Sequence, residues 1–214
     1  MKLDDYIKDP NKIEEKSFQL IRAATDLSGF DEDEQQLVMR LVHTSGNPDI
    51  AAQVRISTAA IDAGIAALNR DATVLCDVEM VKQGLTKRYL DAEPMCFLNH
   101  EKTVARASAS GETRSMSALE LWTPHLRESI VIIGNAPTAL FRLLEMLEAG
   151  SVKPSLIIGM PVGFVGAPES KDYLWDHRAD LGVECITLRG RVGGSALAAG
   201  AFNTLVRLKN GLLF

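Results

Sequence analysis

His43 is the residue of this chain whose type and position best suit proton transfer near neutral pH. It falls off the apolar stripe of a helix predicted between Asp31 and the breaker segment 45–48, close to the helix end. Arg40 lies three residues earlier and shares its face. A neighbouring arginine could hold an acidic substrate and tends to lower the pKa of an imidazole, whereas a helix C-terminus tends to raise it. A solvated surface histidine beside a surface arginine is the alternative. The stripe consists of Leu37, Val38, Leu41 and Val42.

Ser17 is a polar residue where the helical pattern predicts an apolar one. It lies on or beside the core-facing stripe of a helix predicted over 11–26. A small hydroxyl in such a place usually donates to a backbone carbonyl one turn earlier. That local bond and a role in a site both remain open for Ser17. The stripe is predicted to contain Ile13, Leu20, Ile21 and Ala24.

Three glycine-rich or proline-rich loops follow predicted strands and lead into helices, at 134–138, 159–168 and 189–195. Glycine lets a backbone approach a ligand closely, and the free N–H groups at a helix start favour anions. Asn135 in the first loop and Gly190 in the third are therefore candidate ligand contacts. Loops between strands and helices need turn residues in any case, so ordinary turns are the alternative.

Arginines could give these loops a basic lining. Arg114 opens a predicted helix, and Arg189 and Arg191 flank the first glycine of the third loop. Together, the three guanidinium groups could bind a polycarboxylate. Each one taken alone could equally be a solvated surface charge.

Short apolar runs alternate with helical patterns from about residue 54 onward. Continuous apolar runs are typical of strands covered on both faces, and strand–helix alternation predicts a doubly wound, mostly parallel α/β sheet. Such sheets bind ligands at the carboxyl ends of their strands. The length of 214 residues suits a single domain over 1–214. The expected strands cover 73–76, 94–98, 129–133, 155–158 and 184–188. The expected helices cover 57–69, 114–121, 137–149, 168–180 and 195–209, after two N-terminal helices.

The composition is that of a globular protein, and it narrows the class of partner. The net charge of −5 argues against a general binder of nucleic acid or membrane surfaces, but it allows a local basic site. No apolar stretch approaches the length of a membrane span, and the polar segment 1–16 does not resemble a signal peptide. Cys76, Cys96 and Cys185 have no C-x-x-C spacing, which predicts free thiols in a reducing, cytoplasmic compartment.

Several cofactor-binding patterns are missing from the sequence. It contains no G-x-x-x-x-G-K-[ST] phosphate loop, no intact G-x-G-x-x-G and no G-x-S-x-G nucleophile elbow. The scattered histidines show no familiar metal-ligand spacing. What remains is acid–base chemistry without a cofactor or metal, or no chemistry.

Motifs along nearly the whole chain resemble those of a known family. They are Tyr6-Ile7, Asp9-Pro10, Ser17-Phe18, Ile21-Arg22, Arg40-Leu41-Val42-His43, Cys76-Asp77-Val78-Glu79-Met80-Val81, Thr113-Arg114-Ser115, Gly134-Asn135-Ala136-Pro137-Thr138-Ala139-Leu140, Gly159-Met160-Pro161-Val162-Gly163-Phe164-Val165 and Arg189-Gly190-Arg191-Val192-Gly193-Gly194. The segments G-N-A-P-T-A-L and G-x-P-V-G-F-V are specific in this combination. In these motifs the chain resembles the precorrin-8X methylmutases, also called precorrin isomerases, of corrin-ring biosynthesis.

The resemblance implies a flavodoxin-like, three-layer α/β/α fold with N-terminal helices. It also implies a homodimer whose site lies near the subunit interface. The implied reaction is a cofactor-free 1,5-sigmatropic shift of a methyl group from C-11 to C-12 of precorrin-8, or of its cobalt complex. This reaction yields hydrogenobyrinate or cobyrinate. The implied ligand is therefore a tetrapyrrole-derived macrocycle.

The resemblance also assigns roles to residues. His43 corresponds to the family's catalytic histidine, and Ser17 and Arg40 correspond to substrate-binding positions. Arg114, Arg191 and the loops with Asn135 and Gly190 are expected to hold the ring through its peripheral carboxylates.

Two other functions remain open. One is a non-catalytic carrier of a corrinoid or tetrapyrrole with the same fold. The other, with the resemblance set aside, is a nucleotide-binding α/β domain. The sequence does not decide whether the substrate carries cobalt, nor the direction of proton transfer at His43.

Overall fold

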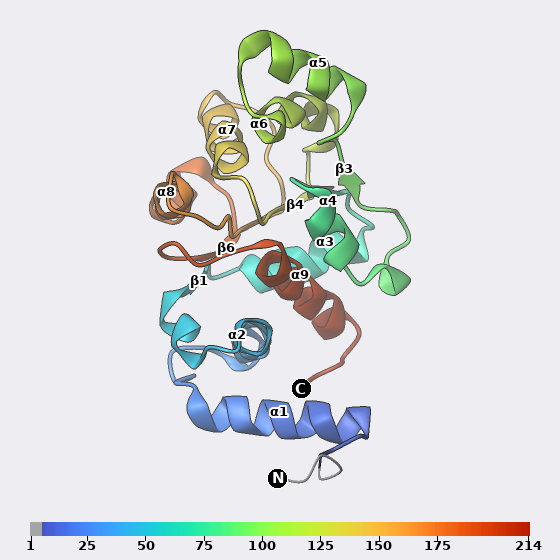
Figure 1. The fold of residues 1–214 in the computed structure, drawn as a ribbon, viewed down its shortest axis with the longest axis vertical. Coiled ribbons are helices and arrows are strands. Elements are labelled where there is room, and N and C mark those ends of the chain that lie inside the picture. The colour runs from blue at the N-terminus through green and yellow to red at the C-terminus, as the bar shows by residue number, and fades with distance from the viewer. Residues whose placement is uncertain (1–5) are drawn as a thin grey trace.

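A six-stranded sheet forms the middle of the molecule, which a computed structural model describes for residues 6–214 (Figure 1). Residues 1–5 lie outside the described residues. They begin the polar segment 1–16, which was predicted not to be a signal peptide. The strands are β1 Val54–Ile56, β2 Val74–Cys76, β3 Met95–Cys96, β4 Ile130–Ile133, β5 Leu156–Gly159 and β6 Cys185–Leu188.

The strand order confirms the expected mostly parallel sheet. The order is β1-β6-β5-β4-β2-β3, and the strands from β2 to β6 pair in parallel. Numbered by themselves, these five strands follow the order 2-1-3-4-5, which is that of flavodoxin-like folds. Each of the five expected strands is present, within one or two residues of its expected ends.

Strand β1 was not expected. It pairs antiparallel with β6, with Val54 opposite Leu188 and Ile56 opposite Ile186. A strand of three residues is too short to show a period in the sequence. Its pairing with a segment about 130 residues away is a tertiary contact that no local pattern records.

Helices cover both faces of the sheet, and none of those within residues 6–214 is long and apolar enough to cross a membrane. The seven expected helices are present, although the one over 114–121 is divided between α6 and η3. The α-helices are α1 Pro10–Ala24, α2 Glu32–Ser45, α3 Ala60–Asn69, α4 Glu79–Gly84, α5 Glu101–Ser110, α6 Arg114–Ala118, α7 Pro137–Glu148, α8 Ala167–Leu181 and α9 Ser195–Lys209. The 3₁₀-helices are η1 Pro48–Gln53, η2 Lys87–Tyr89 and η3 Leu119–His125.

Helices α4 and α5 were not expected. Helix α4 has only six residues, which is less than two turns. Helix α5 buries only Thr103 and Ala107, so it carries no apolar stripe that a sequence pattern could reveal.

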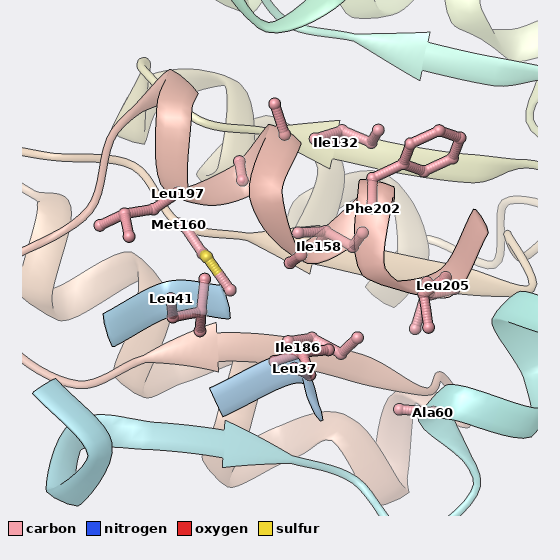
Figure 2. Close-up of a cluster of buried hydrophobic side chains, with 14 of the residues drawn as sticks. Leu37, Leu41, Ala60, Ile132, Ile158, Met160, Ile186, Leu197, Phe202 and Leu205 are labelled. Carbon is pink, nitrogen blue, oxygen red and sulfur yellow. The ribbon is translucent and has the colours of Figure 1, made fainter. Parts of the chain in front are cut away.

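Alternate side chains of the central strands fill two hydrophobic cores, one on each face of the sheet. Ile130 and Ile132 of β4 belong to the core beneath α2, α3 and α9, whereas Val131 and Ile133 belong to the core beneath α7 and α8. The expected three-layer α/β/α arrangement is therefore confirmed. Figure 2 shows the first core, in which side chains of α2 and α9 meet the sheet; labelled there are Leu37, Leu41, Ile132, Ile158, Ile186, Phe202 and Leu205.

Helix α1 lies outside this sandwich, against α2 and away from the sheet (Figure 1). Phe18 is its one buried residue. Ile13 is 47% exposed and Leu20 is 58% exposed, so the prediction that they face a core is wrong. The physical reason is that α1 packs on a single inner helix, which leaves most of its apolar stripe uncovered.

Helix α2 is fixed at both of its ends. Asp31 accepts a hydrogen bond from the backbone N–H of Glu34, whose side chain accepts one from the N–H of Asp31, so the predicted cap is a full capping box. At the other end, α9 approaches closely at Gly200, where a Cβ atom would lie 3.2 Å from Thr44 Oγ1 and 3.6 Å from Arg40 Cγ. This close approach sets the place of the last turn of α2.

Candidate active site

The imidazole of His43 is held at the last turn of α2 by a residue of α1. A hydrogen bond joins Ser17 Oγ and His43 Nδ1 at 3.0 Å. Ser17 therefore forms a hydrogen bond with a side chain of the neighbouring helix. The alternative prediction, a bond to a backbone carbonyl one turn earlier in its own helix, is wrong. With Nδ1 engaged, Nε2 is the ring nitrogen that remains for a substrate.

Two phenylalanine rings support the same imidazole. The ring of Phe18 stacks on that of His43, with centroids 5.2 Å apart and planes inclined by 12°. Phe18 also stacks against Phe214, near the end of the chain, at 4.0 Å. Ser17-Phe18 is one of the family-like motifs, but the motif alone does not indicate that Phe18 stacks on His43. Nothing in the sequence around Phe214 indicates its contact with α1.

Arg40 adds positive charge beside this imidazole. Its Nη2 lies 3.6 Å from Glu14 Oε1, and its Cζ lies 4.2 Å from the centre of the Phe214 ring. Burial, followed by the charge of Arg40, lowers the pKa of His43 below its ordinary value, whereas Glu14 opposes the change. The site therefore favours the neutral imidazole in the free protein.

An open cavity of about 330 Å³ lies beside His43. Most of its walls are apolar, so a ligand with a flat apolar face and a polar edge suits it. Leu20, Ile21 and Ala24 of the α1 stripe contribute to these walls. The lining residues are Ser17, Leu20, Ile21, Ala24, Val42, His43, Gly46 and Pro48. Within residues 6–214, no group of three or more His, Cys, Asp or Glu side chains is arranged to hold a metal ion.

Asn135, Gly190 and Arg191 lie elsewhere, in the loops that follow β4 and β6. The backbone N–H of Asn135 donates to Asp77 Oδ2 at 2.8 Å, and Asn135 itself is exposed. Gly190 has a φ of 76°, a left-handed conformation that favours glycine. The Cζ of Arg191 lies 5.0 Å from the centre of the Phe164 ring. These three residues therefore occupy the predicted carboxyl edge of the sheet.

Arg114 lies at the start of α6, where its Nη1 donates to Asn99 Oδ1 at 3.0 Å. A hydrogen bond of 2.8 Å between the hydroxyls of Thr113 and Thr138 ties this start to the first turn of α7. In the part of the chain that the structure describes, no hydrogen bond, ion pair or ring contact joins Arg114, Asn135, Gly190 or Arg191 to His43. The structure thus brings together Ser17, Arg40 and His43, and it leaves the other four candidates in other elements.

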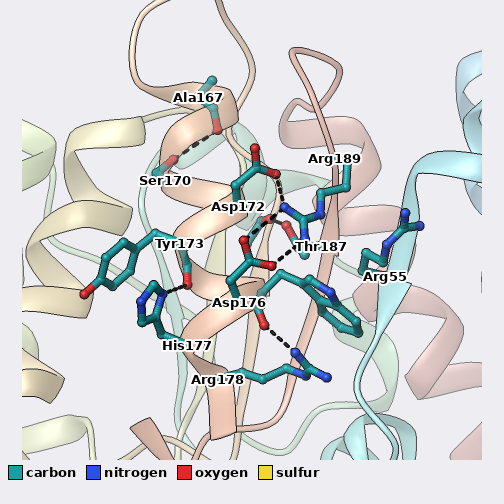
Figure 3. Close-up of polar contacts among 12 residues, drawn as sticks. Arg55, Ala167, Ser170, Asp172, Tyr173, Asp176, His177, Arg178, Thr187 and Arg189 are labelled. Atoms are coloured by element: carbon teal, nitrogen blue, oxygen red, sulfur yellow. Dashed lines mark hydrogen bonds and ion pairs between the residues drawn. The ribbon is translucent and has the colours of Figure 1, made fainter. Parts of the chain in front are cut away.

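Arg189 does not contribute a free charge to the third loop. Its guanidinium donates to Asp172 at 2.6 Å and to Asp176 at 2.5 Å, both on α8 (Figure 3). These carboxylates neutralise it and fasten α8 to the end of β6. The expectation that Arg189 helps to line a polycarboxylate site is therefore wrong, because its partners lie 13 and 17 residues earlier, out of reach of a local pattern.

Asp77 shapes the loop after β4, and sequence reasoning missed this role. Its carboxylate is 1% exposed and accepts hydrogen bonds from the backbone N–H groups of Gly134 at 3.1 Å, Asn135 at 2.8 Å and Ala136 at 2.9 Å. Burial raises the pKa of Asp77, whereas these N–H donors act against the rise. Its place directly after a buried strand was the signal in the sequence.

Comparison with known proteins gives these features a family. The family model for precorrin-8X methylmutase (CbiC) matches residues 12–208. A precorrin-8X methylmutase from Sinorhizobium sp is 50% identical over 205 residues, which cover 95% of this chain and 97% of the relative. A cobalt-precorrin-8 methylmutase from Leptospira interrogans is 33% identical over 205 residues, or 92% of this chain and 93% of the relative.

The fold agrees with a solved structure of the same kind. The crystal structure of a precorrin-8X methylmutase from Thermus thermophilus superposes with a TM-score of 0.85 at 35% identity, and the match covers 95% of this chain and 98% of the other. Family model, relatives and structure agree over nearly the whole length. This chain belongs to the precorrin-8X methylmutase family.

Proposed function

We propose that the protein is an isomerase that moves a methyl group from C-11 to C-12 of precorrin-8 and so forms hydrogenobyrinate in corrin-ring biosynthesis. The observation that carries this proposal is the site of Ser17, Arg40 and His43 in a chain that belongs to this family. The shift breaks one carbon–carbon bond and forms another within one molecule. It therefore needs no acceptor, and the protein has to orient the ring and manage its protons.

The proposed role of His43 is proton partner of the ring. Ser17 fixes Nδ1, so Nε2 can donate a hydrogen bond or a proton to a ring nitrogen and make the ring a better electron sink. General acid catalysis of this kind contributes roughly 10²–10⁴-fold. Ser17 and Arg40 are proposed to contact the substrate, together with Arg114, Arg191 and the loops of Asn135 and Gly190.

Spectroscopy tests this role directly, because the shift changes the ring chromophore. With precorrin-8, the wild-type protein should give the product spectrum, and His43→Ala should bind the ring without converting it. Full turnover by His43→Ala would refute the acid role. A wild-type protein that binds the ring and leaves it unchanged would instead be a carrier.

We further propose that the metal-free ring is the substrate. The relative with the higher identity, 50%, is named for precorrin-8X, whereas the relative named for cobalt-precorrin-8 is 33% identical. Assays with both rings test this choice. A kcat/KM for cobalt-precorrin-8 equal to or above that for precorrin-8 would contradict it.

We also propose a homodimer of single-domain chains, 1–214, in the cytoplasm. Supporting the dimer, Ile13 and Leu20 leave apolar surface of α1 uncovered, and Leu20 lines the His43 cavity. Supporting the compartment, all three cysteines are free thiols. Sedimentation velocity of the wild type should give twice the mass of one chain, and the Ile13→Glu variant should give the mass of a single chain. A monomeric wild type would contradict the dimer.

A further inference from the structure

A second cavity borders the same turn of α2 that carries His43. It has a volume of about 350 Å³ and lies between α2, α9 and the segment 84–89. We name it the Arg88 pocket. Its polar walls are made by Arg40, Thr44, Thr86, Arg88, Asn203 and Arg207.

The charge of this pocket is unusual for the protein. Three guanidinium groups line it and no Asp or Glu of the described part of the chain does, although the whole chain carries a net charge of −5. Like charges gathered in a partly buried space repel one another. An anion in the pocket would remove that repulsion.

Among residues 6–214, the carboxylates do not neutralise the three arginines. Glu14 Oε1 lies 3.6 Å from Arg40 Nη2 and 3.8 Å from Arg207 Nη1, so a single carboxylate faces two cations at distances too long for hydrogen bonds. Arg207 Nε is buried and has no hydrogen-bond partner. Within residues 6–214, Arg88 forms no ion pair, and its Cζ lies 4.6 Å from the centre of the Tyr89 ring.

The repulsion from Arg207 also appears in the ionisation of Arg40. Burial, followed by the charge of Arg207, lowers the pKa of Arg40, and Glu14 opposes the change only in part. The two side chains are only 21% and 26% exposed, so water screens them incompletely.

The walls of the pocket are held in place by hydrogen bonds. Asn203 Oδ1 accepts from the backbone N–H of Thr86 at 2.7 Å, and its Nδ2 donates to the carbonyl of Gly84 at 2.9 Å. The amide of α9 thus fixes the segment that carries Arg88. Because this side chain is satisfied and the Thr44 hydroxyl donates to the carbonyl of Arg40 at 2.8 Å, the arginines are the main groups available to an anion.

We propose that the Arg88 pocket binds a carboxylate side chain of the macrocyclic substrate while the reacting part of the ring lies at His43. The inference rests on the proposed function, because it takes the ligand to be that polycarboxylate. Thr44 of the pocket directly follows His43 in the chain, so a rigid ring with acidic arms can contact both. Arg88 and Arg207 are the residues that this inference adds to the site.

A charge-removing variant with a neighbouring control tests the pocket. Arg88→Gln removes one lining cation, whereas Lys87→Gln removes the adjacent cation, which pairs with Glu93 at 2.8 Å and does not line the pocket. Absorbance titration with hydrogenobyrinate gives the dissociation constant of each protein. Arg88→Gln should weaken binding about tenfold or more, because it removes a charge-assisted contact, and Lys87→Gln should change it less than about twofold.

The kinetics and a second anion complete the test. With precorrin-8, Arg88→Gln should raise KM by a similar factor and change kcat less. If the wild type binds and converts the ring but Arg88→Gln has the same dissociation constant and KM, the pocket inference is overturned and the proposed function stands. If the wild type neither binds nor converts the ring, both fail. If calorimetry shows inorganic phosphate binding that requires Arg88, while ring affinity does not, the pocket is an inorganic-anion site.

Discussion

At the scale of single residues, the site depends on how one imidazole is held. Two consecutive residues of α1 reach it, since Ser17 binds Nδ1 and the ring of Phe18 stacks on the imidazole. One contact fixes the rotation of the ring and the other fixes its plane. The remaining nitrogen, Nε2, therefore has a defined direction before any substrate arrives, which reduces the entropic cost of catalysis.

Arg40→Gln should raise the pKa of His43. The charge of Arg40 is the second cause of the lowered pKa, and Glu14, which raises it, would lose one of its two counter-ions. NMR titration of the imidazole C–H signals measures the change, with His43→Gln used to assign the signal. If His43 is the proton donor, the alkaline limb of kcat/KM should move to higher pH with it.

A matched control for this prediction is Arg70→Gln. Arg70 is an exposed arginine at the C-terminal end of α3, and it makes no contact with His43 in the described residues. This variant should leave the His43 titration unchanged. An unchanged or lower His43 pKa in Arg40→Gln would show that burial alone sets the value.

At the scale of elements, the approach of α9 to α2 places the catalytic turn. Gly200→Val should push the two helices apart, because even a Cβ atom at Gly200 would lie 3.2 Å from Thr44 Oγ1. Overpacking of this kind costs about 1–3 kcal/mol of unfolding free energy. Urea denaturation measures that loss, and a reduced kcat should accompany it because the turn with His43 moves.

The control for Gly200→Val is Ala179→Val, at an exposed position of α8. It introduces the same β-branched side chain into a helix without a facing element. Its unfolding midpoint and kcat should stay close to those of the wild type. Equal losses in the two variants would mean that helix propensity, and not the α2–α9 approach, is responsible.

A second link between elements is the contact of Asp77 with the loop after β4. Asp77→Ala should lower the unfolding free energy by about 3 kcal/mol or more, because three backbone N–H groups would lose their acceptor inside the protein. Urea denaturation measures the loss. Asp91→Ala, at an exposed carboxylate, is the control. If the urea midpoint of Asp77→Ala equals that of the wild type, water replaces the carboxylate as the acceptor of these hydrogen bonds.

At the scale of the whole molecule, the candidate residues occupy two regions. Ser17, Arg40 and His43 lie between α1 and α2, outside the inner layers, whereas Asn135 and Arg191 lie in loops at the carboxyl edge of the sheet. The candidates predicted from the sequence thus come both from the N-terminal helices and from the loops that follow the strands. A large macrocycle with acidic arms is a ligand that can use several such regions at once.

The stability of the whole molecule should depend on pH through Lys171, whose side chain is fully buried. Its Nζ donates to the carbonyl of Val192 at 2.6 Å, and burial lowers the pKa of Lys171 from 10.5 to about 8. Between these two values the unfolded chain binds more protons than the folded one, so the wild type should gain stability as pH rises from 8 to 10.5.

Comparison with Lys171→Met isolates this effect. The unfolding free energy of the wild type minus that of Lys171→Met should increase with pH between about 8 and 10. Lys102→Met, at an exposed position of α5, is the control variant. If this difference in unfolding free energy is constant or falls with pH, the lowered pKa of Lys171 is contradicted.

The sequence by itself determined the five parallel strands, the helices α6, α7 and α8 between them, the cap at Asp31 and the place of His43 off the apolar stripe of α2. These features follow from periodicity and capping, which act over a few neighbouring residues. The family motifs are local strings as well, which is why the family could be named before the fold.

Only the tertiary structure decided which side chains meet. The pair of Ser17 and His43, the stacking of Phe214 on Phe18 and the antiparallel strand β1 join segments that lie far apart in the chain. The pairing of Arg189 with α8 is of the same kind. Packing between whole helices and strands determines such contacts. The residues that neighbour each partner in the sequence therefore do not indicate which contact it makes.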